Sequence, residues 1–294
     1  MCSQAERPAA YGHAAPGFVL EVVPPPRPAR LNGVSMAGFR DRGPGTLDMR
    51  AVPHPSVTLA LDFGPGALHV EDAAGRRGAT VAAGLAFAGL RVSGRDLLAV
   101  QVRLSPLVAR AVLGAGPAEL AGSVVALEDI WGREAALLRE RLSHVPTWAG
   151  RFAMTEELLV RRYEAGRVRH VVPAEVAWAW GRIARSRGGV RVEALATETG
   201  WSRQRLWSRF RAHIGLTPQR AAHLVRFHHA AHRLAAGRSP GSVAAESGYF
   251  DQSHLHRHVR SFTGVTPAAL AREPFLAVDD DAWPGHAPPV SGRR

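Results

Sequence analysis

The chain has 294 residues and a formal net charge of +12, which is enough length for two domains and a substantial core. Its single cysteine, Cys2, excludes an intrachain disulfide framework and a cysteine-based zinc site. No apolar run approaches the roughly 18 residues that a membrane-spanning helix needs. No signal-peptide pattern opens the sequence, so we expect a cytoplasmic protein with no membrane partner.

The basic charge comes entirely from arginine and is concentrated in one part of the chain. The sequence holds 37 basic residues and no lysine, a bias that a GC-rich coding sequence explains. Between residues 182 and 272, however, fifteen arginines stand against four acidic residues. This distribution indicates a polyanionic partner, with nucleic acid as the first candidate and an anionic membrane as the second.

The first part of the chain predicts a β-rich domain behind an unstructured start. Residues 1–30 are rich in Pro, Ala and Gly and show no periodicity, so we expect them to be disordered. Over residues 31–165 short apolar runs alternate with glycine turns, most clearly at 57–63 and 97–104. Closely spaced strands of this kind favour a β-barrel or β-sandwich, which we expect to serve as a sensor or dimerisation domain.

Helical spacing replaces strand alternation after residue 105. Apolar residues recur at helical intervals over 107–113, 130–142 and 152–163, which predicts a helical flank on the β-rich domain. Pro173 then suits the first turn of a helix over 174–187. We expect residues 166–275 to form a DNA-binding domain and the Pro/Gly-rich residues 276–294 to be a disordered tail.

One small module occurs twice, over residues 195–218 and 243–267. In each copy a short helix ends at a Gly followed by an aromatic residue, and a second helix closes on Gly-x-Thr-Pro. Two helices joined by a tight glycine turn form a helix-turn-helix, whose second helix enters the major groove of DNA. The sequence therefore predicts two adjacent groove contacts by one chain.

The first candidate recognition helix covers residues 203–213, with Ser202 as its N-cap. Leu206 and Phe210 are four residues apart and should face inward. The opposite face carries side chains suited to base or phosphate contacts, for which a solvated charged surface is the alternative. These are Arg203, Gln204, Trp207, Ser208 and Arg211.

The second candidate recognition helix covers residues 252–262, with Asp251 as its N-cap. Leu255, Val259 and Phe262 form its inward stripe, and Arg257 is the best candidate for reading guanine. The expected DNA contacts on this helix are Gln252, Ser253, His254, Arg257 and Arg260.

A long helix over residues 218–236 separates the two modules. Its apolar stripe consists of Leu224, Phe227, Ala231 and Leu234. The length of this helix sets the distance between the recognition helices, which we expect to enter successive major grooves about 34 Å apart.

Several histidines have a spacing that raises the question of a metal site. His228 and His232 are four residues apart, as are His254 and His258, and such pairs can bind zinc. No cysteine lies nearby and carboxylates are few, whereas polar helix faces and DNA contacts account for these residues. In the β-rich part His54, His69 and Glu71 are too sparse to indicate a cupin metal set, and His69-x-Glu71 fits strand alternation equally well. We therefore expect no metal and no cofactor.

Residues 195–270 resemble the DNA-binding domain of AraC/XylS-type transcription regulators. The residues that carry the resemblance are LA…G.S…L…F…G.TP, the linking-helix Arg226 with Ala230 and Leu234, and A…G..DQSHLHR…GVTP. The resemblance implies base contacts from Gln204, Trp207, Ser208, Ser253, His254 and Arg257. In the N-terminal part, LDFGPGALHVED and VAAGLAFAGLRV are similar to a cupin-like sensor domain found ahead of this DNA-binding domain.

The sequence departs from the family pattern in the first recognition helix and in the second module. Ser208 replaces a frequent Arg, and Arg209 stands where an apolar residue is common. Residues 243–245 read VAA, where an Ile-Ala pair is usual. From the replacement at Ser208 we expect weaker guanine reading by the first helix, with part of the base reading moved to Arg205 or Arg209.

We therefore expect a two-domain α+β protein that regulates transcription, not an enzyme. The resemblance implies a promoter site in double-stranded DNA, an unidentified effector, and activation as the outcome. It admits RNA polymerase and a second copy of the chain as further partners. Residues that could line an effector cavity, with surface placement as the equal alternative, are Arg40, Arg42, Asp62, Phe63, His69 and Arg103.

Two alternatives belong to other functional classes. One is a cupin-like protein that binds a small molecule and has no sequence-specific role on DNA. The other is a DNA-targeted repair enzyme with Cys2 as its reactive thiol, although no nucleophile–base pair or phosphate loop accompanies that cysteine.

Overall fold

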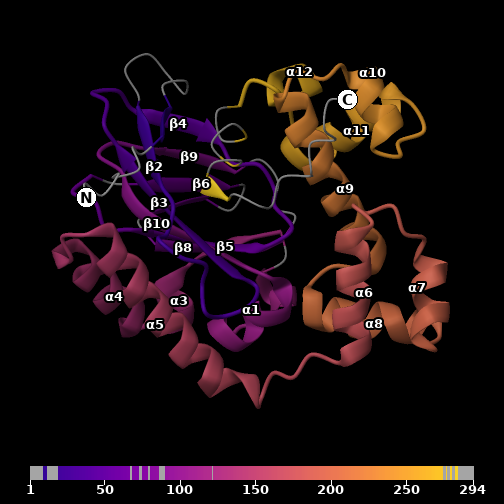
Figure 1. Cartoon of the computed structure of the whole chain (residues 1–294), viewed down its shortest axis with the longest axis horizontal. Coiled ribbons are helices and arrows are strands. Elements are labelled where there is room, and N and C mark those ends of the chain that lie inside the picture. The colour runs from indigo at the N-terminus through magenta and orange to yellow at the C-terminus, as the bar shows by residue number, and fades with distance from the viewer. Residues whose placement is uncertain are drawn as a thin grey trace, which may run out of the picture.

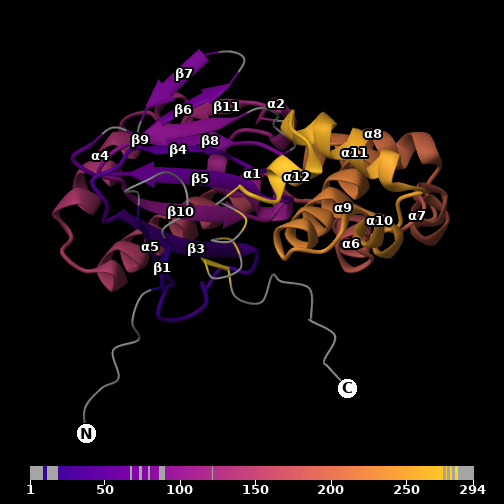
Figure 2. The same cartoon turned by 90° about the horizontal axis from the view of Figure 1, so that it is seen from above.

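A β-sheet domain with a helical flank comes first along the chain and an all-helical domain follows it. The two domains lie side by side (Figures 1 and 2). The computed structural model describes residues 9–11, 19–66, 68–72, 75–78, 80–85, 90–120, 122–273, 276, 279 and 282–283. This arrangement confirms the expected two-domain α+β fold, with a β-sheet domain and an all-helical domain. Within the described residues no helix is both long and apolar enough to cross a membrane.

The β-sheet domain contains two antiparallel sheets. The larger has the strand order β1-β2-β3-β10-β5-β8-β11 and the smaller the order β4-β9-β6-β7. The strands of the larger sheet are β1 (Ala9–Tyr11), β2 (Leu20–Val23), β3 (Val34–Asp41), β5 (Val57–Asp62), β8 (Thr80–Ala83), β10 (Leu98–Leu104) and β11 (Val124–Ala126). Those of the smaller sheet are β4 (Leu47–Arg50), β6 (His69–Asp72), β7 (Gly75–Gly78) and β9 (Arg91–Gly94).

The central strand β10 divides its side chains between two environments. Val100 and Val102 join the core that the helices cover, whereas Ala99, Gln101 and Arg103 line a cavity on the opposite face of the strand. Successive residues of a strand point to opposite faces, so the alternation of 98–104 seen in the sequence sends every second side chain toward the cavity. Arg103 reaches the domain interior for this reason.

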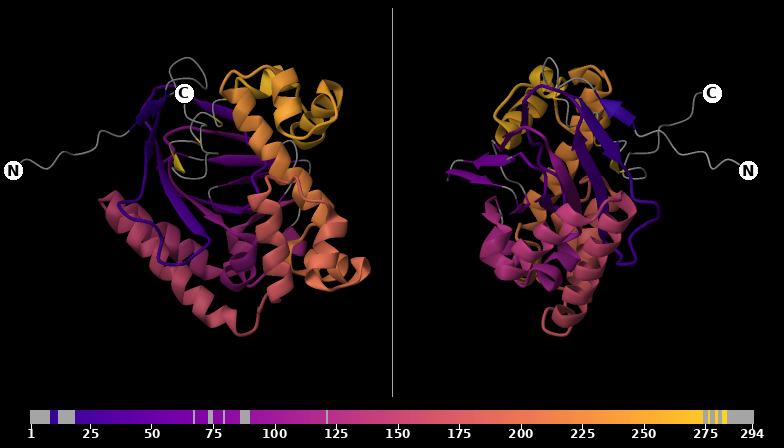
Figure 3. Two further views of the ribbon diagram at one scale, coloured as in Figure 1. Left: turned by 45° about the vertical axis from the view of Figure 1, so that its right-hand side comes forward. Right: turned by 90° about the vertical axis from the view of Figure 1, so that its left-hand side faces the viewer.

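The helical flank covers one face of the larger sheet, with α5 extending along it (Figure 3). The expected helix over 130–142 is instead two helices, because Gly132 between them adopts φ +56° and ends the first. The helices of the flank are α1 (Pro106–Leu113), α2 (Pro117–Leu120), α3 (Leu127–Trp131), α4 (Arg133–His144) and α5 (Trp148–Arg167).

The helical domain follows the predicted elements closely. Its linking helix α9 runs from the α6–α8 group to the α10–α12 group (Figures 1 and 3). The helices are α6 (Ala174–Arg185), α7 (Val192–Thr199), α8 (Arg203–Ile214), α9 (Pro218–Ala235), α10 (Pro240–Glu246), α11 (Gln252–Thr263) and α12 (Pro267–Leu270).

The segment 1–30 contains structure that its composition did not indicate. β1 pairs with β2, and β2 pairs in turn with β3 at the edge of the larger sheet. Leu20 and Val22 are buried, so two apolar residues suffice to attach an otherwise Pro/Gly-rich segment to the core. The expectation of disorder is therefore wrong for these strands, while residues 1–8 and 12–18 lie outside the described residues.

The segment after α12 returns to the β-sheet domain, so the expectation of a disordered tail is wrong for its first part. Leu276, Asp279, Ala282 and Trp283 are all buried. Trp283 is 3% exposed, packs among core residues of the β-sheet domain, and lies 4.2 Å from the guanidinium carbon of Arg103. Burial of this large ring outweighs the turn-prone composition of the segment. Residues 284–294 lie outside the described part.

Replacement of Phe210 by Ala should lower the free energy of unfolding by about 3–5 kcal/mol, because the fully buried ring leaves a cavity in the helical domain. Arg211→Ala, on the exposed face of the same helix, should change it by less than about 0.5 kcal/mol. Urea unfolding followed by circular dichroism measures both. Unchanged stability of Phe210→Ala would refute the inward orientation of this residue.

Replacement of Trp283 by Ala should also lower the free energy of unfolding by about 3–5 kcal/mol, because its indole is buried in the β-sheet domain. Trp207→Ala is the matched control, since Trp207 is 40% exposed and should lose much less. Thermal unfolding of the two variants in parallel provides the comparison. Equal losses would show that the segment after α12 is not packed as described.

Candidate nucleic-acid interface

The first helix-turn-helix is defined by a glycine turn and a capped second helix. α7 ends at Gly200, which adopts φ +67° in the left-handed region that favours glycine. The Ser202 hydroxyl then accepts a hydrogen bond from the Arg205 backbone N–H at 3.2 Å and caps α8. Leu206 and Phe210 are buried, so the inward face of α8 is the one expected and its other face points outward.

The second helix-turn-helix repeats this construction. Gly248 adopts φ +70° after α10, and Tyr249 is buried behind the turn. The Asp251 carboxylate accepts a hydrogen bond from the His254 backbone N–H at 2.6 Å and caps α11. Leu255 and Val259 are fully buried, as the stripe in the sequence indicated.

The outward faces of α8 and α11 carry the side chains that the sequence assigned to DNA. Ten of the eleven are exposed, and His254 is half-buried because its ring packs 5.3 Å from that of Tyr249. Arg203 makes a long surface contact of 3.8 Å with Glu193. The exposed ten are Arg203, Gln204, Arg205, Trp207, Ser208, Arg211, Gln252, Ser253, Arg257 and Arg260.

The linking helix α9 holds the two modules together through its core face. Phe227 is fully buried and stacks on Phe262 of α11 with ring centroids 4.8 Å apart. On the other side, the loop after α6 approaches so closely that a Cβ on Gly188 would lie 2.1 Å from the Ala222 carbonyl oxygen. Gly188 also adopts φ +75°, so glycine is required there for two reasons.

Arg226 connects the linking helix to the loop before the first module and to the turn of the second. Its guanidinium donates to the Gly188 carbonyl oxygen at 2.7 Å, before the first module, and to the Gly248 carbonyl oxygen at 3.3 Å, in the turn of the second. Arg226 is one of the residues that carry the family resemblance, and in the structure it makes these two hydrogen bonds across α9. One side chain thus ties the loop between α6 and α7 to the turn of the second module.

A polar groove lies between α7, α8 and α9 on the side that presents the first recognition helix. Gln204 and Trp207 line it together with His223 and Arg226. Burial, followed by the charge of Arg226, lowers the pKa of His223, so the ring is neutral near pH 7. The sequence did not indicate His223 as part of this face, because its half-buried place depends on the packing of α9 between the modules.

A second group of histidines supports the turn of the second module. The Tyr249 hydroxyl lies 3.1 Å from His258 Nδ1, and the two rings are 5.4 Å apart. Burial, with smaller contributions from His223 and His254, lowers the pKa of His258 to about 4. His258 is therefore a neutral packing residue in α11.

His228 and His232 lie at the junction of the two domains. Both are buried, at 7% and 9% exposed, and the rings of His54 and His228 are 4.4 Å apart. The expectation that polar helix faces and DNA contacts account for this pair is therefore wrong. The β-sheet domain covers that face of α9, which a helix taken by itself cannot show.

The two domains also meet at the first recognition helix. α8 contacts α1 and α2 of the β-sheet domain. Burial, then Arg110 of α1 and Arg209 of α8, lower the pKa of His213, which places this flank of α8 beside α1. A change in the position of the β-sheet domain would therefore reach the recognition helix without an intermediate element.

An apolar cavity of about 120 Å³ lies within the β-sheet domain, between residues of both sheets. Of the six residues proposed to line an effector cavity, Arg103 does so. Asp62 is buried and caps a turn, accepting from the Gly64 and Leu68 backbone N–H groups at 3.2 Å each. Arg42 instead forms an ion pair with Glu21 at 2.5 Å.

The remaining three of these six residues, Arg40, Phe63 and His69, do not line the cavity. The Arg40 guanidinium carbon lies 5.7 Å from the Trp148 ring, and Phe63 belongs to the core that the helices cover. His69 begins β6 and is half-buried. Side-chain chemistry suggested these residues, but strand register decides which of them face the cavity.

Residues 195–273 match a family model described as "Helix-turn-helix domain", which spans both modules. A comparison with curated proteins found no match. Among solved structures, an apo K231A form of ToxT from Vibrio cholerae is 12% identical with a TM-score of 0.45, over 83% of this chain and 98% of that one. The AraC-like transcriptional activator CuxR is 14% identical with a TM-score of 0.33, over 87% and 86%.

The C-terminal domain of AraT, a response regulator from Geobacillus stearothermophilus, is 20% identical with a TM-score of 0.32, over 34% of this chain and 86% of that one. With TM-scores below 0.5, these likenesses carry no conclusion about the chain. The match to the family model and the two capped modules show that residues 195–273 form a helix-turn-helix domain, as the repeat in the sequence predicted.

Proposed function

We propose that this protein regulates transcription by binding a specific promoter site in double-stranded DNA. The observation that carries the proposal is the pair of exposed recognition helices, α8 and α11, held by one linking helix and a shared arginine, Arg226. Two such helices fit two successive major-groove segments on one side of the duplex. In the proposed complex we expect the two recognition helices to lie about 34 Å apart along the duplex.

Individual side chains take different roles in the proposed complex. Gln204 and Arg257 are exposed and have the donor groups that read base edges, Gln for adenine and Arg for guanine. Ser208 is too short for a bidentate contact, so the neighbouring Arg205 or Arg209 supplies part of the reading in α8. The other arginines of the region contact phosphates and provide the salt-dependent share of the affinity.

We further propose that the β-sheet domain responds to an effector that binds in its apolar cavity. The cavity has an apolar lining that includes one charged residue, Arg103, but its 120 Å³ is smaller than the roughly 300–1,000 Å³ of ordinary ligand sites, so the proposal requires it to widen around its effector. An effector alters transcription only when it favours one arrangement of the two domains over another. The contact of α1 and α2 with α8 is where that difference would reach DNA. RNA polymerase and a second copy of the chain are partners that the family resemblance adds to this proposal.

Selection of bound fragments from genomic DNA with the purified protein tests the proposal. We expect enrichment of one motif with two segments spaced by about one helical turn. Failure to enrich any motif, with a folded protein, would leave the cupin-like small-molecule binder as the better reading of the chain.

Arg257→Ala should weaken binding to the selected site by roughly 1–3 kcal/mol and relax the preference at one base pair. Arg141→Ala, an exposed arginine of α4 in the β-sheet domain, is the control and should leave both unchanged. Binding to a library of single-base variants of the site measures both effects. An equal loss on every variant would make Arg257 a phosphate contact instead.

A fragment that starts at residue 166 should retain specific binding to the same site, because both modules and their linking helix lie within it. Circular dichroism confirms that the fragment is folded, and gel-shift titration compares its affinity with that of the full chain. A folded fragment that does not bind would show that the β-sheet domain is needed, for example to pair two copies.

A further inference from the structure

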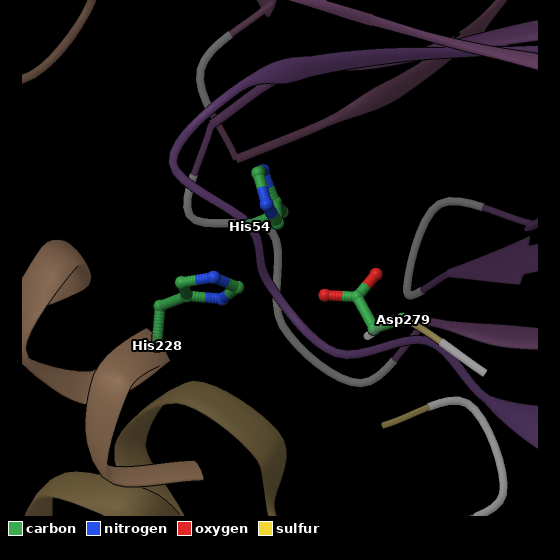
Figure 4. A group of neighbouring side chains, drawn as sticks. All are labelled: His54, His228 and Asp279. Carbon is green, nitrogen blue, oxygen red and sulfur yellow. The ribbon is translucent and has the colours of Figure 1, made fainter. Parts of the chain in front are cut away.

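Three buried side chains from three separate segments converge where the two domains meet (Figure 4). They are His54 from the loop between β4 and β5, His228 from α9, and Asp279 from the segment after α12. Each is between 6% and 7% exposed, and one potential ligand atom from each lies within 4.8 Å of the others. His232, one helical turn after His228, lies beside them, with its ring 4.5 Å from that of His228.

The surroundings of these side chains orient them as metal ligands are oriented. His54 Nδ1 lies 2.6 Å from the Ser56 hydroxyl, so this ring would coordinate through Nε2. Arg103 donates to Asp279 Oδ1, which leaves Oδ2 on the histidine side, 3.0 Å from His232 Nε2. Ligating histidines and carboxylates are commonly held in this way by a hydrogen bond on their far atom.

We propose that His54, His228 and Asp279 bind a divalent transition-metal ion, with zinc as the first candidate and a water completing its coordination, while His232 orients Asp279 through its hydrogen bond to Oδ2. Zinc is commonly held in a tetrahedron by imidazole and carboxylate donors, with water in a remaining position, at about 2.0–2.2 Å. That geometry places ligand atoms about 3.4 Å apart. Side-chain movements of about 1 Å would therefore bring this set together.

Arg103 limits the strength of the site. Its guanidinium already balances the Asp279 carboxylate, so a divalent cation adds uncompensated positive charge in a buried place. We therefore expect weaker binding than the same donors would give without the arginine. We therefore expect a site that takes up and releases its ion reversibly, unlike a permanent structural zinc site.

The ligands belong to both domains, so the ion would cross-link them. His54 is part of the β-sheet domain, His228 is part of the helix that spaces α8 and α11, and Asp279 ties down the returning segment. Occupancy would stabilise the arrangement described here. Its effect on DNA affinity rests on the proposed function, whereas metal binding itself does not.

The experiment uses the full chain without a histidine tag, stripped of metal by a chelator and dialysed. Titration with Co²⁺ should give one saturable site per chain with the visible absorption of tetrahedral cobalt, and Zn²⁺ should displace it. Zn²⁺ should also raise the unfolding temperature. If no saturable binding is found, the cluster is only the ion pair and hydrogen bond that Asp279 makes with Arg103 and His232, and the proposal is overturned.

His228→Gln and His54→Gln should each weaken Co²⁺ binding by more than about tenfold and abolish stabilisation by Zn²⁺. The matched control is His223→Gln, on the same helix as His228 but outside the cluster, which should bind as the wild type does. The two cluster variants lie in different domains, so the test remains possible if one of them does not fold. Circular dichroism of the metal-free proteins shows whether each variant is folded. Equal binding by cluster and control variants would overturn the site.

Affinity for the selected promoter fragment, measured with and without Zn²⁺, separates the two proposals. A change in the wild type that is absent from His228→Gln supports both the site and its coupling to DNA. Metal binding with unchanged DNA affinity supports the site and overturns the coupling. DNA binding by a protein that takes up no metal supports the proposed function and overturns the site.

Discussion

The packing of α9 is the constraint on which the rest of the helical domain depends. A helix-turn-helix of two short helices has too little apolar surface to be stable alone, and each module here completes its core against α9. Phe227 supplies the contact to the second module, and the close approach at Gly188 holds the loop before the first module against α9. The hydrogen bonds of Arg226 tie this loop and the turn of the second module to the same helix. Because one rigid element serves both modules, the spacing of the recognition helices is a property of the fold.

The junction between the domains rests on a different interaction, the buried ion pair of Arg103 and Asp279. Both groups are almost wholly removed from water, and loss of one partner from such a pair typically costs about 3–5 kcal/mol because the other charge remains buried. A pair of this kind specifies position more than it adds stability. It places the segment after α12 against β10, and the indole of Trp283 then covers the guanidinium. The histidines of α9 and the β4–β5 loop are brought together around this pair.

The apolar cavity, the domain junction and the helices α8 and α11 are connected by direct contacts. The cavity is bounded by Arg103, which contacts the returning segment, and this segment contacts α9 through His232. On the other side α1 and α2 lie against α8. A ligand that alters either contact biases the position of the DNA-binding domain, and the required energy is only the difference in its affinity for two arrangements. The proposed metal site and the proposed effector cavity would act on the same junction.

The sequence by itself determined the helical domain almost to the residue. Caps such as Ser202 and Asp251, the glycines at the turns and the apolar stripe of α9 are local signals, since each acts within one or two turns of helix. They also placed ten of the eleven expected DNA contacts on exposed faces, because the side of a helix opposite its apolar stripe is fixed by periodicity.

Only the tertiary structure decided what happens at the junction. Arg103 and Asp279 are 176 residues apart, and no local pattern links them. Residues 276–294 are Pro/Gly-rich as a whole, yet Trp283 is buried because the β-sheet domain offers it a matching apolar surface. His228 lies on a helix face that reads as polar, and another domain covers that face. Periodicity shows which face of an element is apolar, but the contacts between distant segments are set by the complementary surfaces that meet when the chain folds.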